Sequence, residues 1–185
     1  MELSRPQVLI AMGVTAILLG AIAKVWLWLG NVRVLALSWN GVAIAQGLAV
    51  GICIVSLSQA VYYLWPAYKT SAETYMNVVL RPLTWPDLVW LGLLPGLSEE
   101  LLFRGVALAV LGVTPGGIAI SSLIFGSMHL LDIEQWPYGV WATVVGVILG
   151  ISVMMTGNLL VPIVAHIFAN TVSSGLWKAY KQKEA

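Results

Sequence analysis

Long runs of apolar residues, separated by short polar segments, dominate the pattern of this chain. A membrane-spanning helix needs about 20 predominantly apolar residues, and Trp residues tend to mark its ends. The sequence therefore predicts six spans, at residues 8–30, 41–65, 88–112, 116–131, 138–156 and 159–177. Pro95 and Gly96 interrupt the third run, for which an interfacial helix followed by a shorter span is the alternative.

Small residues recur three or four positions apart within several of these runs, so they would share one face of a helix. Such faces let helix backbones approach closely in lipid. We therefore expect one compact bundle with packing faces at Gly47 and Gly51, Gly117 and Ser121, Ser122 and Gly126, and Gly139, Thr143, Gly146 and Gly150.

The composition agrees with this pattern. Of the 185 residues, 59% are hydrophobic and 9% are charged, against roughly 25% charged residues in a soluble domain. This excludes a disordered chain and an ordinary cytosolic protein. The predicted fold class is all-α, a single polytopic transmembrane bundle over residues 1–185 that is surrounded by membrane lipid. A net charge of +1 without a basic stripe excludes nucleic acid as a partner.

The basic residues predict the orientation, because cytoplasmic loops carry an excess of Lys and Arg. A cytoplasmic N-terminus leaves Arg33 on the opposite side and makes both termini cytoplasmic. The cytoplasmic side then holds Arg5, Lys69, Arg81, Lys178, Lys181 and Lys183. The small residues Ala21-Ile22-Ala23 after the first apolar stretch leave a cleaved signal peptide as the alternative for the N-terminus.

Three charged residues fall within the third apolar run. Glu99, Glu100 and Arg104 would each cost about 3 kcal/mol at the centre of a bilayer, more than the surrounding apolar residues return. Glu100 and Arg104 are four positions apart, so a helix places them on one face as an ion pair. Glu99 points about 100° away and lacks such a partner, which suits a general base in a polar cavity.

An alternative interpretation treats the two acids as the start of a helix. Ser98 is a residue type favoured at the N-cap, and Glu99 and Glu100 would then occupy the first turn, where the helix dipole favours acids. This alternative accounts for the acids but not for Arg104, which lies deeper in the same apolar run.

The two histidines of the chain lie in the fourth and sixth apolar runs. Phe125 precedes His129 by four positions and Asn170 follows His166 by four, so each pair shares a helix face. Ionisable residues within spans tend to pair with one another and to mark functional sites. At about 1.5 Å per residue, Glu99 and His166 each lie roughly 17 Å from the expected cytoplasmic ends of their spans. We therefore expect them to converge with His129 in the cytoplasmic half.

These residues resemble the motifs of the CAAX protease and bacteriocin-processing family, a group of intramembrane glutamic endopeptidases related to the Rce1-type CAAX prenyl protease. In family order the motifs read Glu99-Glu100-Leu101-Leu102-Phe103-Arg104, Phe125-Gly126-Ser127-Met128-His129 and His166-Ile167-Phe168-Ala169-Asn170. The resemblance covers about residues 86–175, the motif-bearing core, and the first two spans carry no motif.

The resemblance implies that helices around a polar cavity hydrolyse peptide bonds without a covalent intermediate and without a cofactor. Carried over residue by residue, Glu99 would activate water as the general base, with assistance from His129. His166 and Asn170 would hold the oxyanion of the tetrahedral intermediate. The expected substrate is a peptide or membrane protein, with or without a lipid anchor. The residues expected to support this site are Glu100, Arg104 and Phe125.

Three other functions remain open alternatives. Glu99, His129 and His166 form a two-histidine, one-carboxylate set of the kind that binds zinc, although the chain has no His-Glu-x-x-His sequence. A non-catalytic scaffold or immunity-type protein with the same fold would use none of this chemistry. The buried ionisable residues also suit a proton-coupled transporter.

Overall fold

A computed structural model describes residues 3–184, and the regular elements in this range are all helical, which confirms the predicted all-α class. Most of the chain lies in long helices joined by short connections. The elements are α1 (Arg5–Gly30), α2 (Gly41–Leu64), α3 (Pro66–Leu80), α4 (Asp87–Glu100), η1 (Leu101–Ala107), α5 (Leu108–Leu111), α6 (Pro115–Ser127), η2 (Ile133–Gln135), α7 (Trp136–Thr156) and α8 (Leu160–Glu184).

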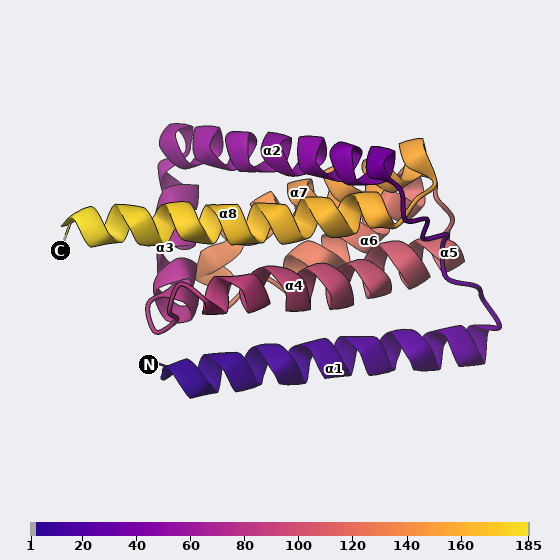
Figure 1. Ribbon diagram of the computed structural model, residues 1–185, viewed down its shortest axis with the longest axis horizontal. Coiled ribbons are helices and arrows are strands. Elements are labelled where there is room, and N and C mark those ends of the chain that lie inside the picture. The colour runs from indigo at the N-terminus through magenta and orange to yellow at the C-terminus, as the bar shows by residue number, and fades with distance from the viewer. Residues whose placement is uncertain (1–2, 185) are drawn as a thin grey trace.

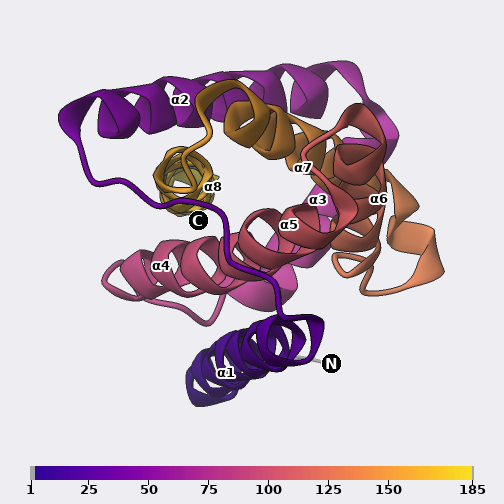
Figure 2. The ribbon, with the colours of Figure 1, turned by 90° about the vertical axis from the view of Figure 1, so that its right-hand side faces the viewer.

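The long helices lie side by side and form one bundle (Figure 1). Helices α1 and α4 start at the end of the bundle where both termini lie, α2 and α8 run toward that end, and α3 lies across it. The segment between α1 and α2 crosses the opposite end (Figure 2). The two termini therefore share one side of the bundle, and the assignment of that side to the cytoplasm stays a prediction.

Within the described residues, four helical stretches are long and apolar enough to cross a membrane, namely Arg5–Gly30, Gly41–Leu64, Ile133–Thr156 and Leu160–Lys183. They correspond to the first, second, fifth and sixth predicted spans. The fourth prediction was too long, because α6 has 13 residues and ends at Ser127, a length of about 20 Å. Helix α8 continues beyond the sixth predicted span to Glu184.

The third predicted span is a continuous helical segment from Asp87 to Leu111, formed by α4, η1 and α5. Pro95 lies inside α4 without ending it, so the alternative of two separate helices is wrong. Beyond Glu100 the helix widens into a π-helix, in which the Leu108 N–H donates to the carbonyl of Phe103. Irregular helical turns of this kind recur at functional sites, and this one directly follows the two glutamates.

The alternative that made Ser98 a helix N-cap is also wrong. Ser98 lies in the interior of α4, and its hydroxyl donates to the carbonyl of Leu94 at 2.8 Å. The helix begins eleven residues earlier at Asp87, whose carboxylate binds Arg5 of α1 through two hydrogen bonds of 2.7 and 2.8 Å. The acids Glu99 and Glu100 therefore need partners elsewhere in the bundle.

Helix α3 is an element that the hydrophobic pattern did not predict. Its sequence is too polar to resemble a span, but Tyr68, Ser71 and Ala72 are buried against the bundle. Tyr68 stacks on Tyr138 of α7 with ring centroids 6.2 Å apart. The helix therefore covers the end of the bundle where the termini lie.

The small residues do bring the helices into close contact, as predicted. A Cβ atom at Gly47 of α2 would lie 2.6 Å from the Val164 Cβ of α8, and one at Gly51 would lie 3.0 Å from the carbonyl oxygen of Ala165. The same holds between α6 and α7, where a Cβ at Gly126 would meet the Thr143 hydroxyl at 1.9 Å. Glycine therefore sets the helix separations.

The close contact at Gly47 generates a prediction. Gly47→Ala places a methyl group against Val164 and should lower the free energy of unfolding by about 1 to 3 kcal/mol, because α2 and α8 must separate. Gly13→Ala is the matched control, since its Cβ would meet no atom within 4 Å. Thermal unfolding of both variants in detergent measures the difference. Equal stability of the two would contradict glycine-dependent packing.

Candidate active site

A buried ion pair lies at the centre of the site. Arg104 Nη1 of η1 donates to Glu100 Oε1 at 2.8 Å, and the side chains are 1% and 0% exposed. The four-residue spacing places both on one helix face, as the sequence predicted. A buried pair of this kind is stable only when its remaining polar atoms also find partners.

Arg104 has further partners that the sequence motifs did not indicate. Its Nη2 donates to the backbone carbonyl of Gly146 at 3.0 Å, and its guanidinium carbon lies 4.5 Å from the centre of the Phe125 ring. A Cβ at Gly146 would lie 3.2 Å from this Nη2. The spacing of Gly146 marks it as a packing residue, but its backbone is also a ligand of the buried arginine.

His166 of α8 connects the ion pair to the second glutamate. Its Nδ1 lies 2.7 Å from Glu100 Oε1, and its Nε2 lies 3.9 Å from Glu99 Oε2. Helix α4 packs antiparallel to α8, and Gly96 lies directly against Ile167. This packing brings His166 next to the two glutamates. Glu100 therefore accepts hydrogen bonds from both Arg104 and His166 through one oxygen.

The longer predicted span implied that His129 lies within a helix. In the structure His129 instead lies in the turn after α6 and reaches the site from there. Its Nδ1 lies 2.8 Å from the backbone oxygen of Phe125. A carbonyl can only accept, so Nδ1 carries the hydrogen and the Nε2 of the neutral ring is left as an acceptor. This contact satisfies one of the free carbonyls at the end of α6 and orients Nε2 toward Glu99.

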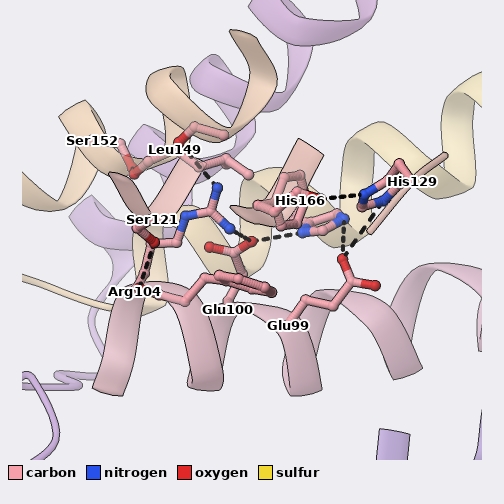
Figure 3. A network of polar contacts seen from close by, with 11 residues as sticks. Glu99, Glu100, Arg104, Ser121, His129, Leu149, Ser152 and His166 are labelled. Carbon is pink, nitrogen blue, oxygen red and sulfur yellow. Dashed lines mark hydrogen bonds and ion pairs between the residues drawn. The ribbon is translucent and has the colours of Figure 1, made fainter. Parts of the chain in front are cut away.

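Glu99, His129 and His166 converge on one point (Figure 3). The Glu99 Oε2 atom lies 4.0 Å from His129 Nε2 and 3.9 Å from His166 Nε2. This oxygen is buried and has no hydrogen-bond partner among the described residues. At a tetrahedral angle, two hydrogen bonds of about 2.8 Å that meet at one water oxygen join atoms about 4.6 Å apart. The observed separations are about 0.6 Å shorter, so a small movement of these side chains would let them hold one shared water molecule.

Phe125 separates the polar groups of the site from the rest of the core. It is 2% exposed, and its ring centroid lies 4.6 Å from that of His129 and 6.0 Å from that of His166. One ring therefore contacts both histidines and also the guanidinium of Arg104. Its position fits the supporting role that the motif implied.

A cavity of about 520 Å³ opens beside the histidines. Its lining includes His129, His166 and Asn170, together with aromatic side chains of α2, α3, α7 and α8. Asn170 is partly exposed one turn after His166 on α8, so its amide can reach a molecule in the cavity. The volume falls within the range of about 300 to 1,000 Å³ that is typical of ligand sites.

The donor types of the site also suit zinc, but the distances suit it less well. Zinc ligands at about 2.0 to 2.2 Å from the metal lie about 3.3 to 3.6 Å apart in a tetrahedral site, whereas the histidine nitrogens lie 3.9 and 4.0 Å from Glu99 Oε2. The described residues form no cluster of three or more His, Cys, Asp or Glu side chains with metal-binding geometry. The zinc alternative stays a prediction, which removal of metal by chelation tests.

The buried ion pair predicts a large stability effect. Arg104→Met leaves Glu100 without its cation and should lower the free energy of unfolding by about 3 to 5 kcal/mol. The double variant Glu100→Leu/Arg104→Met should regain part of this loss, because no uncompensated charge of the pair remains. Exposed Arg33→Met serves as the control in detergent unfolding. A single Arg104 variant as stable as the control would contradict this account.

Comparisons with known proteins match the part of the chain that holds this site. Residues 81–172 match the family described as Rce1-like, type II CAAX prenyl endopeptidase. The chain is also 28% identical over 151 residues to an uncharacterized protein, YpbD of Bacillus subtilis (strain 168), which covers 82% of this chain and 72% of that relative. No solved structure matches.

The matched range contains the two glutamates, Arg104, both histidines and Asn170, and it excludes α1 and α2. The apolar helices and this match together identify a membrane protein. Through residues 81–172 the chain belongs to the Rce1-like family of CAAX prenyl endopeptidases.

Proposed function

We propose that the protein is a membrane-embedded endopeptidase in which Glu99 activates water for attack on a peptide bond. The observation that carries the proposal is the unpartnered Glu99 oxygen, which two imidazole nitrogens face at 3.9 and 4.0 Å. A general base must lie within hydrogen-bond reach of the proton that it removes, directly or through one water. Glu100 is less suited to this role, because its Oε1 already accepts from Arg104 and His166.

The reaction proceeds by direct attack of water. Glu99 takes one proton from the water molecule, and the water oxygen bonds to the carbonyl carbon of the substrate. The carbonyl electron pair moves to its oxygen, which becomes the oxyanion of a tetrahedral intermediate. As the C–N bond breaks, the proton on Glu99 passes to the leaving amine. His129, whose Nε2 faces the same Glu99 oxygen, assists by orienting the water.

The position of His166 suits it to hold the oxyanion. It faces both carboxylates, with Nδ1 toward Glu100 and Nε2 toward Glu99. In the imidazolium form both ring nitrogens are donors, so Nδ1 donates to Glu100 while Nε2 donates to the oxyanion together with the Asn170 amide. One such donor contributes about 3 to 4 kcal/mol in other enzymes.

The substrate of the proposed reaction is a peptide or membrane-protein segment that enters the cavity beside the histidines. The family description names prenyl endopeptidases, so peptides with a prenylated cysteine are the first substrates to compare with unmodified ones. The aromatic lining of the cavity offers apolar surface to either kind of chain.

Glu99→Gln should lower kcat by at least about 100-fold, because the amide cannot accept the proton of water. The variant should still fold, since its Oε2 makes no hydrogen bond to a described residue. Cleavage of quenched fluorescent peptides, with and without a prenylated cysteine, measures the loss in detergent. Glu134→Gln is the control, because Glu134 is an exposed glutamate. Undiminished cleavage by Glu99→Gln would overturn the proposal.

Activity should survive exhaustive chelation, because the proposed reaction uses only side chains and water. Loss of cleavage on chelation, with recovery on adding zinc, would instead favour the metalloprotease with Glu99, His129 and His166 as ligands. A biological effect that persists in Glu99→Gln would favour a scaffold, and proton flux across vesicles would favour a transporter.

A further inference from the structure

The cavity continues along α8 well beyond the residues of the proposed reaction. Its lining on this helix runs from His166 through Ser173 and Trp177 to Tyr180. The fourteen steps from the first to the last of these positions span about 21 Å at about 1.5 Å per residue. An extended peptide covers that length with about six residues at about 3.3 Å each. The cavity therefore suits an extended segment and not only the two residues beside a cleaved bond.

Packing of α2 on α8 explains where the cavity lies. The two helices run in parallel, because Gly47 lies against Val161 and Val164, while Gly51 lies against Ala165 and Phe168. Farther along α2 the residues on this face are larger, and Ser58, Gln59 and Tyr62 line the cavity instead. The same register brings Tyr62 to the level of Trp177. We call the part of the cavity lined by Tyr62, Lys69, Trp177 and Tyr180 the outer subsite.

The charge of the outer subsite comes from one cation. The described lining residues include no Asp, Glu or Arg, and Lys69 of α3 is the single lysine among them. Its Nζ lies 5.2 Å from the centre of the Tyr62 ring. Glu73, one turn further along α3, accepts a hydrogen bond from the Tyr62 hydroxyl at 2.5 Å, and no ion pair of Lys69 with a described carboxylate is found within 4.0 Å.

Trp177 contributes apolar surface to the same subsite. Its side chain lines the cavity and also packs against the core cluster of Val8, Leu80, Leu83 and Leu88. The described lining contains no Asp or Glu that could neutralise Lys69 from within the cavity. Lys69 therefore favours a ligand that carries a negative charge.

We propose that the outer subsite binds a carboxylate of the substrate, with Lys69 as its ionic partner. This inference rests on the proposed function, from which it takes that the bound molecule is a peptide. The carboxylate lies up to about six residues from the bond beside Glu99, given the length of the cavity. It comes either from the C-terminus of the peptide or from an acidic side chain, and Lys69 is then a specificity-determining residue outside the reacting groups.

Binding to the Glu99→Gln protein tests the subsite without cleavage. The probes are apolar octapeptides of three kinds that carry a neutral fluorophore such as a BODIPY dye, which has no carboxylate. The first has a free C-terminal carboxylate, the second has a C-terminal amide, and the third is a set of amides with one Asp at successive positions. Fluorescence anisotropy in detergent measures their Kd values. We expect the free acid, an Asp-containing amide, or both to bind at least tenfold more tightly than the plain amide, and the pattern identifies the source of the carboxylate.

Lys69→Met in the same background should reduce this preference to less than twofold. Lys24→Met is the matched control, because Lys24 is exposed on α1 and outside the cavity lining, and it should keep the full preference. Lys69→Glu should reverse the preference toward an amide that carries one Lys.

Two results would overturn the inference. One is an unchanged preference for carboxylates in Lys69→Met, and the other is the absence of binding by every probe. Because these are binding measurements on a variant that does not cleave, they are independent of the activity test. A parent protein without peptidase activity that still binds carboxylates through Lys69 would refute the proposed function and leave the subsite standing.

Discussion

The buried ion pair between Glu100 and Arg104 is the constraint on which the rest of the site depends. Two charges can lie in an apolar bundle only when their hydrogen-bonding capacity is met from all sides. The Gly146 carbonyl, the Phe125 ring and the His166 imidazole contribute to this from α7, α6 and α8, and the Oε2 atom of Glu100 is left without a described partner. Each of these contacts fixes a helix against the segment that carries the glutamates, so the ion pair also determines where His166 lies.

Two adjacent glutamates consequently have different surroundings. Glu100 points into the bundle and is fully buried, whereas the side chain of Glu99 is 15% exposed and turned toward the histidines. The rotation of about 100° between successive helix residues produces this difference. Each carboxylate has one buried oxygen without a described partner, but Glu100 accepts from Arg104 and His166 through its other oxygen. The difference between the two glutamates is therefore that Glu100 is tied into the ion pair, whereas Glu99 faces both histidines.

Glycine faces and the cavity are two results of the same packing. Where α2 presents Gly47 and Gly51, its backbone touches α8 and no space is left. Where it presents Ser58 and Tyr62, space opens between α2, α3, α7 and α8. The histidines lie near the boundary between these regions. The close-packed half holds the polar groups rigidly, and the open half gives a chain-shaped ligand access to them.

The sequence by itself determined the all-α membrane class, the glycine contacts, the Glu100–Arg104 spacing and the motif-bearing residues, because periodicity and charge scarcity act locally along a helix. It did not reveal α3, whose polar sequence matches no span, nor the end of α6 before His129. Only the tertiary structure decided that Glu99 meets both histidines, that Gly146 binds Arg104 through its backbone, and that Lys69 and Trp177 line one cavity. These contacts join residues far apart in the chain, and their distances depend on how the helices pack against one another.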